Sequence, residues 1–225
     1  MNDDFSKLTS LLRRASREDR ANLAKILDIE GADTPEELAY RFHELRAGVI
    51  GQFFSGDDYK QLVTDVADHV GVDWDGLLRG RSWERLATAK IEDAIVLKAF
   101  QRLYESLSEA DRRELAKELG NAAKDPNLVG QILTGGAMVL GRLSGMQIYI
   151  VATTAVGALT SALGITLPFV IYTGITRAIG VVLGPIGWIF LGISVLFQIN
   201  RPKWSRLIPG IVYISYIRHK RAAKK

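Results

Sequence analysis

The first 125 residues carry apolar positions at helical spacing, interrupted by residues that typically begin and end helices. Ser16 offers a cap after the first apolar segment, and Gly31 offers a stop after the second. Thr34 is a stronger cap, because proline follows it and Glu37 stands three residues on. The pattern predicts successive amphipathic helices and no strand, with a loop over residues 73–81. The predicted core positions are Phe5, Leu8, Leu11, Leu12, Leu23, Ile26, Leu27, Leu38, Phe42, Leu45, Tyr59, Leu62, Val63, Val66, Val70, Ile91, Ile95, Leu97, Phe100 and Leu103.

Two of these segments repeat one pattern. Residues 16–27 and 108–119 agree at seven of 12 positions, including the leading serine and an aspartate three residues later. A cap, an early acid and a leucine stripe recur in any well-made helix, so coincidence explains the match simply. A duplicated protein-docking helix is the alternative.

The pattern changes after residue 125, where Pro126 marks a break. Residues 126–200 contain two charges in 75 positions, so that 143–176 and 178–200 are uncharged runs of 34 and 23 residues. Each run is long enough to cross a bilayer, which takes about 20 mostly apolar residues. We predict spans over 147–172, with a break near Pro168, and over 178–199. The shorter uncharged segment 126–141 predicts a buried or interfacial stretch.

The charges follow the same division. All 25 acidic residues lie in 1–125 beside 19 Lys and Arg, a net charge of −6, whereas 126–225 holds 10 bases and no acid. The sequence therefore predicts an all-α protein with an acidic cytosolic helical domain (1–125) and a C-terminal transmembrane hairpin within an apolar, basic-flanked region (126–225).

Basic residues and a tryptophan flank the apolar runs, as the positive-inside rule and the aromatic belt lead one to expect. Arg177 separates the two runs, and we place it at the turn of the hairpin. The basic tail after residue 217 favours anionic lipid over nucleic acid. Both termini are then cytoplasmic, at a bacterial inner membrane. The predicted membrane-interface residues are Arg142, Arg177, Arg201, Lys203, Trp204 and Arg206.

Small residues are concentrated in the apolar region, where 12 of the 21 glycines lie in 126–200. Pairs of small residues four apart allow helices to approach closely, either between copies in a homo-oligomer or within one hairpin. Threonine hydroxyls in the first span either line a wet path or bond back to their own helix. The predicted helix-packing residues are Gly141, Gly145, Ala158, Ala162, Gly180 and Gly184.

No residue constellation indicates catalysis. The chain has no cysteine, and His43, His69 and His219 stand far apart without metal-ligand spacing. No phosphate-binding glycine loop or nucleophile elbow is present. We therefore expect no catalytic residue, no cofactor and no metal.

The sequence resembles the YaaW family of uncharacterised bacterial proteins, which have been likened to the ubiquinol–cytochrome c chaperone fold. The resemblance rests on SREDRANLAKIL within 11–27, VIGQFFSGDDYKQLVTDVADHVGV within 44–78, and AFQRLYESLSEADRREL at 99–115. It implies an all-helical bacterial protein with an apolar C-terminal module and supplies no catalytic residues. The apolar end of this chain is longer and more membrane-like than the family's.

These observations favour a membrane function: permeabilising or oligomerising in the inner membrane through the hairpin. The alternative is a membrane-anchored adaptor or assembly chaperone whose residues 1–125 bind a protein partner. A third interpretation is a soluble protein whose amphipathic helices cover the hairpin.

Membrane fractionation tests the predicted topology. Because two lipid-length apolar runs resist extraction as integral spans do, we expect the full chain to stay in the membrane pellet after carbonate washing. Recovery of the chain in the supernatant would support the soluble, covered form instead.

Overall fold

The computed structural model describes residues 3–29, 31, 34–50, 59–165, 167 and 204–222, and within these ranges it contains helices and loops but no strand. The all-α prediction is therefore confirmed. The helices are α1 (Asp3–Arg13), α2 (Arg17–Leu27), α3 (Pro35–Ile50), α4 (Tyr59–Val70), α5 (Trp74–Leu78), α6 (Thr88–Ser106), α7 (Glu109–Ala123), α8 (Leu128–Gly135), α9 (Gly145–Ala162) and α12 (Trp204–Ala222), with 3₁₀ turns η1 (Trp83–Arg85) and η2 (Gly136–Gly141).

The predicted helix starts are observed as caps. Thr34 accepts a hydrogen bond from the backbone N–H of Glu37, and the Glu37 carboxylate accepts one from the backbone N–H of Thr34. Ser16 and Ser108 each accept from the backbone N–H of the aspartate three residues later, so the two echoed segments form α2 and α7 with matching starts. The loop predicted over 73–81 is wrong in part, because Asp73 caps the short helix α5.

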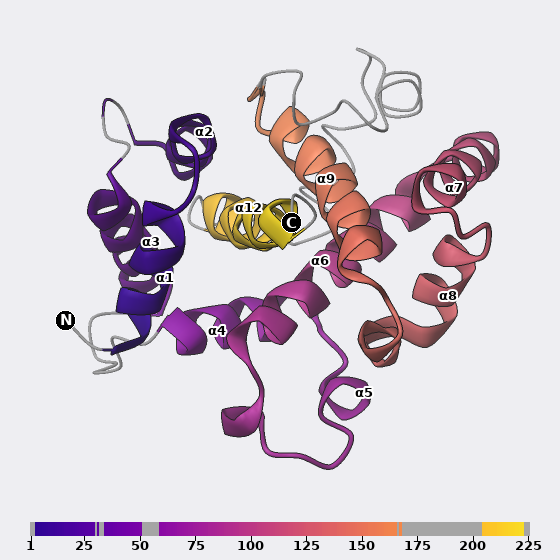
Figure 1. Cartoon of the computed structure of the whole chain (residues 1–225), viewed down its shortest axis with the longest axis horizontal. Helices are drawn as coiled ribbons and strands as arrows, with labels where there is room; N and C mark the ends of the chain where they lie inside the picture. Colours follow the sequence, from indigo (N-terminus) through magenta and orange to yellow (C-terminus); the bar gives the residue numbers. More distant parts are fainter. Residues whose placement is uncertain are drawn as a thin grey trace.

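The C-terminal helix α12 lies at the centre of the bundle. It packs against α9, α6, α2, α3 and α4, and every residue from Leu207 to Ile217 is buried. Figure 1 shows α12 with α1, α2 and α3 on one side, α9 on the other and α4 below it. The predicted division at residue 125 thus separates two sequence regions that are packed together in space.

Contacts along α12 fix the direction of its neighbours. Arg206 in its first turn pairs with Asp28 just after α2, and Lys220 in its last turn pairs with Asp19 near the start of α2. The two helices are therefore antiparallel. The start of α9 also lies beside the end of α12, since a Cβ added at Gly145 would lie 3.7 Å from Nδ1 of His219.

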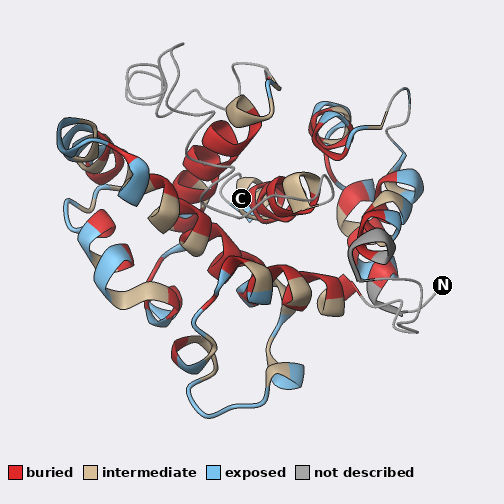
Figure 2. Cartoon of the chain, turned by 180° about the vertical axis from the view of Figure 1, so that it is seen from behind, coloured by how far each residue is buried: buried red, intermediate tan, exposed pale blue. Residues whose placement is uncertain are grey.

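Helix α9 covers the first part of the predicted span 147–172. It begins at Ser144, which forms a capping box with Gln147, and it ends in a turn in which Gly164 has φ +70°. Helices α12, α6 and α7 pack against α9, and most of its residues are buried (Figure 2).

Among the helices that the structure describes, α9 alone is long and apolar enough to cross a membrane, and 67% of that 18-residue window is buried inside the protein. A buried core helix meets the same criteria, so the membrane hairpin is not confirmed. The second predicted span, 178–199, lies outside the described residues, as do Pro168, Arg177, Gly180, Gly184, Arg201 and Lys203.

The packing around α12 leaves no room for a side chain at Gly210. A Cβ there would lie 2.9 Å from Cδ2 of Leu27 and 2.9 Å from Cε1 of Phe42, both of which are fully buried. By contrast, a Cβ at Gly130 in α8 would meet nothing within 4 Å.

We expect Gly210→Val to lower the free energy of unfolding by about 2 kcal/mol or more, because overpacking a close helix contact forces its neighbours to shift. The matched change Gly130→Val should alter stability by less than about 0.5 kcal/mol, since valine favours the helix at least as well as glycine does. Urea denaturation followed by circular dichroism measures both, and equal effects at the two sites would contradict the central position of α12.

Candidate functional site

Two adjacent acids of α6, Glu92 and Asp93, are buried at 0% and 2% exposure. They lie between the apolar residues Ile91 and Ala94, in a helix that packs against α4, α9 and α12. Buried carboxylates are expensive unless cations and hydrogen-bond donors meet them. The C-terminal helix supplies these partners.

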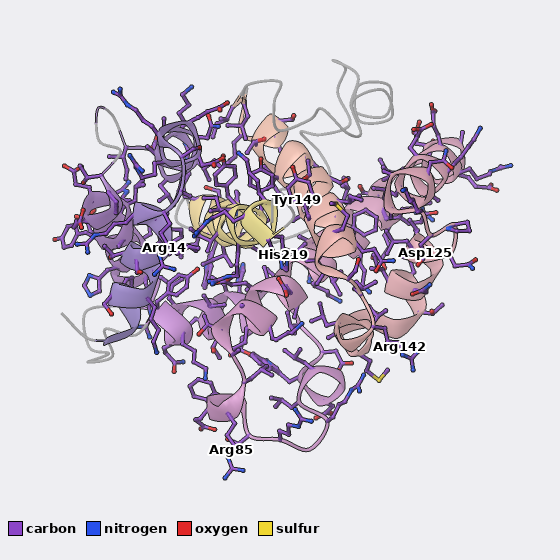
Figure 3. All side chains as sticks on the ribbon, viewed as in Figure 1. Arg14, Arg85, Asp125, Arg142, Tyr149 and His219 are labelled. Carbon is purple, nitrogen blue, oxygen red and sulfur yellow. The ribbon has the colours of Figure 1, made fainter. Side chains whose placement is uncertain are left out.

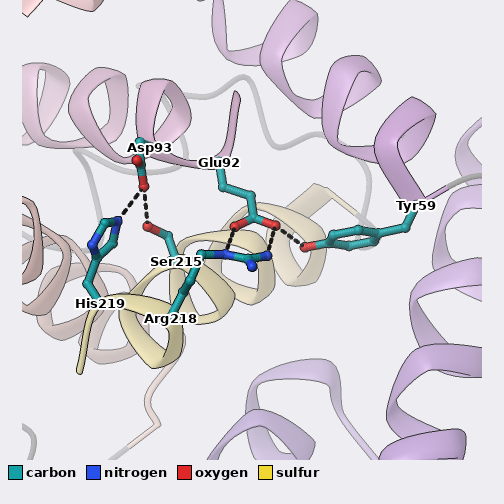
Figure 4. A network of polar contacts seen from close by, with 6 residues as sticks. All are labelled: Tyr59, Glu92, Asp93, Ser215, Arg218 and His219. Atoms are coloured by element: carbon teal, nitrogen blue, oxygen red, sulfur yellow. Dashed lines mark hydrogen bonds and ion pairs between the residues drawn. The ribbon is translucent and has the colours of Figure 1, made fainter. Parts of the chain in front are cut away.

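Glu92 is held by two residues that lie far apart in the sequence, Tyr59 and Arg218 (Figure 4). The Arg218 guanidinium donates from Nε to Oε2 at 2.9 Å and from Nη2 to Oε1 at 3.0 Å. The Tyr59 hydroxyl at the start of α4 donates to Oε1 at 3.1 Å. The bidentate contact with Arg218 is the strongest form of a carboxylate–arginine contact. Together with the Tyr59 hydrogen bond, it joins α4, α6 and α12.

Asp93 contacts two residues of α12, Ser215 and His219, which lie on either side of Arg218 in the sequence. Its Oδ1 accepts a hydrogen bond from Ser215 Oγ at 2.9 Å and lies 2.8 Å from His219 Nε2. Both side chains converge on one oxygen, and no hydrogen bond joins Ser215 to His219 in the described part of the chain. The group therefore lacks the nucleophile–base contact that serine catalysis requires.

A third acid, Asp19 in the first turn of α2, completes the set. Its Oδ1 accepts a hydrogen bond from Lys220 Nζ at 2.6 Å, and its Oδ2 accepts from Ser16 Oγ at 2.7 Å. The Asp19 and Lys220 side chains are 6% and 13% exposed, so this pair is screened much less than a surface ion pair. We call the three contacts Glu92–Arg218, Asp93–His219 and Asp19–Lys220 the acid–base junction.

Burial determines how the ionisable groups near the junction titrate. It raises the pKa of Glu92 above its ordinary value, and the charge of Arg218 opposes that shift. Burial also raises the pKa of Tyr213 and Tyr216 on α12, so both phenols stay protonated. The Glu92–Arg218 contact is therefore an ion pair whose energy depends on pH through the Glu92 carboxyl.

The junction was missed by the sequence analysis, which assigned the basic tail to anionic lipid. The structure pairs Arg218, His219 and Lys220 with acids of α6 and α2. The assignment of the basic tail to anionic lipid stays a prediction. One signal could have found the junction. Since residues 126–225 contain no acid, any buried base there must pair with an acid from 1–125.

The predicted interface residues lie at different places. Arg142 is exposed just after η2. Trp204 stacks on His69 with ring centroids 4.0 Å apart, and Arg206 Nη2 lies 3.5 Å from Oδ1 of Asp28. These contacts tie the start of α12 to α4 and α2, and the assignment of these residues to a lipid interface stays a prediction.

The predicted helix-packing residues are also separated. Gly141 ends η2 and Gly145 begins α9, so this pair does not share one helix. Ala158 is buried and Ala162 half-buried, both in α9. Their contacts with a second copy stay a prediction. In the described ranges, no group of three or more acidic or histidine side chains could hold a metal ion.

The chain is similar to three UPF0174 proteins of Helicobacter pylori. One is 26% identical over 200 residues, which cover 86% of this chain and 91% of the relative. Two from another strain are 24% identical, over 188 residues (82% of this chain and 71% of the relative) and over 200 residues (86% and 91%). No family model and no solved structure matches. The relatives are proteins of an uncharacterised family, as expected, but their names support neither the resemblance to the YaaW family nor the likeness to a chaperone.

We expect Arg218→Met to lower the free energy of unfolding by about 3 kcal/mol at neutral pH, because it leaves a buried carboxylate without its cation. The loss should shrink as the pH falls. A carboxyl whose folded pKa is raised binds more protons in the folded state, so acidification stabilises that state.

The control is Arg113→Met, which removes the ion pair to Glu109 on the surface of α7, where both side chains are at least 75% exposed. It should change stability by less than about 0.5 kcal/mol. Urea denaturation at neutral and acidic pH gives both values. An Arg218→Met deficit that grows on acidification would show that Glu92 does not titrate as described.

Proposed function

We propose that this chain is a bacterial membrane-associated protein that permeabilises or oligomerises in the bilayer by inserting α9 and the uncharged residues 178–200 as a hairpin. The observation that carries the proposal is α9 itself. This helix has the length and composition of a membrane span, yet 67% of it is buried inside the protein, where α6, α7 and α12 pack against it. Water-soluble pore formers keep an apolar hairpin covered in this way before insertion.

The polar groups of α9 support transfer into lipid. The hydroxyls of Thr153, Thr154 and Thr160 donate to the backbone carbonyls of Tyr149, Ile150 and Val156 at 2.8, 3.1 and 2.8 Å. Since these partners belong to the same helix, α9 carries them with it on leaving the bundle. The helix backbone and these three hydroxyls then stay bonded in lipid, which is the main requirement for a span. The Gln147 amide in the first turn donates to Asp125 outside the helix and has to give up that bond.

The acid–base junction supports different roles for the two apolar helices α9 and α12. It holds α12 against α6 and α2, whereas α9 contacts α12 mainly through apolar and aromatic side chains, such as Tyr149 against Tyr216 with ring centroids 5.6 Å apart. Apolar contacts can be exchanged for lipid at little cost, and buried ion pairs cannot. We therefore propose that α9 leaves the bundle and α12 stays.

In this proposal the flanking charges set the inserted topology. Arg142 precedes the first span, and Arg201, Lys203, Trp204 and Arg206 follow the second, so both ends face the cytoplasm at the inner membrane. Ala158 and Ala162 of α9, together with Gly180 and Gly184, supply small-residue faces for packing between copies.

The second candidate is a membrane-anchored adaptor or assembly chaperone, in line with the proposed likeness to the YaaW family. The matching starts of α2 and α7 favour it, because α2 covers α12 while the outer face of α7 exposes Arg113, Glu114 and Lys117. Recovery of a stoichiometric protein partner on the full chain, from a protein that leaves vesicles intact, would favour this function over permeabilisation.

The proposal is tested by crosslinking α9 to α12, so that α9 cannot leave the bundle. The chain has no native cysteine, and a Cβ at Gly145 lies close to His219, so Gly145→Cys with His219→Cys accepts a short, cleavable thiol crosslinker. We expect the crosslinked protein to release no dye from anionic vesicles, because α9 cannot leave α12. The same protein should release dye once the crosslinker is cleaved.

The cleaved double variant is the matched control, since it carries the same substitutions, and Gly145→Cys alone shows the effect of the reagent. Leakage by the crosslinked protein at the rate of the cleaved protein would contradict the release of α9. Intact vesicles over a range of pH and lipid composition, with every form of the protein, would contradict permeabilisation itself.

A further inference from the structure

Large apolar side chains are exposed at few places in the described part of the chain. Leu133, Met138 and Met146 are 36%, 48% and 47% exposed, and they stand on α8, on η2 and at the start of α9. Tyr40 on α3 is exposed by 63% and stands apart from them in the sequence. The concentration of three such residues within 14 positions marks this surface, which we call the α8–η2 surface.

The segment behind this surface is well packed, so the exposed residues are not the result of a loose fold. Leu128, Val129 and Ile132 of α8 are buried, as are Val139 and Leu140 of η2. The Gln101 amide donates to the Ile132 carbonyl at 2.7 Å, which ties α8 to α6. Leu133, Met138 and Met146 are therefore presented to solvent from a fixed support.

Two arginines accompany the apolar side chains. Arg142 is exposed between η2 and α9, and Figure 3 shows it at the edge of the molecule. Arg79, which follows α5, donates from Nη2 to the Met138 carbonyl at 2.6 Å and so lies against η2. Residues 126–146 contain no acid, but α5 packs on η2 and exposes Asp75 one turn before Arg79, so the positive charge of the surface comes from Arg142.

We propose that the α8–η2 surface is the site at which this protein docks on an anionic lipid bilayer. Leucine and methionine enter the boundary between headgroups and acyl chains, while arginine stays with the lipid phosphates. The surface is continuous with α9, whose first turn carries Met146, so docking holds the starting end of the apolar helix at the bilayer. This inference rests on the proposed membrane function, and it names the surface that contacts the bilayer before α9 inserts.

The test is flotation of the full-length protein with vesicles of phosphatidylcholine alone or mixed with phosphatidylglycerol. We expect binding to the mixed vesicles, and Leu133→Gln with Met138→Gln and Met146→Gln should weaken it by on the order of 100-fold. Arg142→Gln should weaken it by about 5-fold and lower its salt dependence. The matched control is Tyr40→Gln, which removes an exposed apolar side chain on α3 and should bind as the wild type does.

We expect circular dichroism to show that each variant remains folded, because the substituted side chains are exposed. The proposal is overturned if the triple variant binds like the wild type, or if Tyr40→Gln loses as much binding. A triple variant that keeps its lipid binding but loses an acidic protein partner also overturns it, in favour of protein docking. Wild-type binding that depends on this surface without dye release would leave docking standing and contradict permeabilisation, so the two failures are distinguishable.

Discussion

The arrangement of this protein depends on the pairing of partly buried bases on its last helix with buried acids from its first half. The second half of the chain contains no acid, so the partners of Arg218, His219 and Lys220 are Glu92, Asp93 and Asp19 from the first half. This requirement places α12 beside α6 and α2, whose acids precede their partners on α12 by more than 100 residues. The net charge of +4 thus conceals a complementarity between two regions of opposite charge.

The same constraint distinguishes the two apolar helices of the second half. Helix α12 is fixed by ion pairs that lipid could not replace, and its apolar stretch of 11 residues is too short to span a bilayer. Helix α9 has no charged residue and satisfies its own threonine hydroxyls. The proposed function needs a bundle that retains α12 and releases α9, and this difference between their contacts supports it. The α8–η2 surface lies where α9 begins, so that docking and release involve neighbouring parts of the molecule.

Local features of the fold were predictable, and long-range ones were not. The caps at Ser16, Thr34 and Ser108 follow from short-range hydrogen bonding, and they were found where the pattern indicated. The burial of Glu92 and Asp93 was not predicted, because helical periodicity places acids on a solvated face unless a distant partner covers them. That partner, Arg218, is 126 positions away. The region 126–225, which includes the apolar residues 207–217, was assigned to the membrane for the same reason: an apolar helix packed in protein and one beside lipid have the same local pattern.

The central claim is that α9 separates from α12 when the protein meets an anionic bilayer. Spin labels on cysteines at Gly141 and Ala222, which are exposed beyond the start of α9 and at the end of α12, report this separation directly. Pulsed electron resonance should give one short distance in solution and a longer, broader distribution on phosphatidylglycerol vesicles. An unchanged short distance on vesicles that the same protein has made leaky would contradict the account.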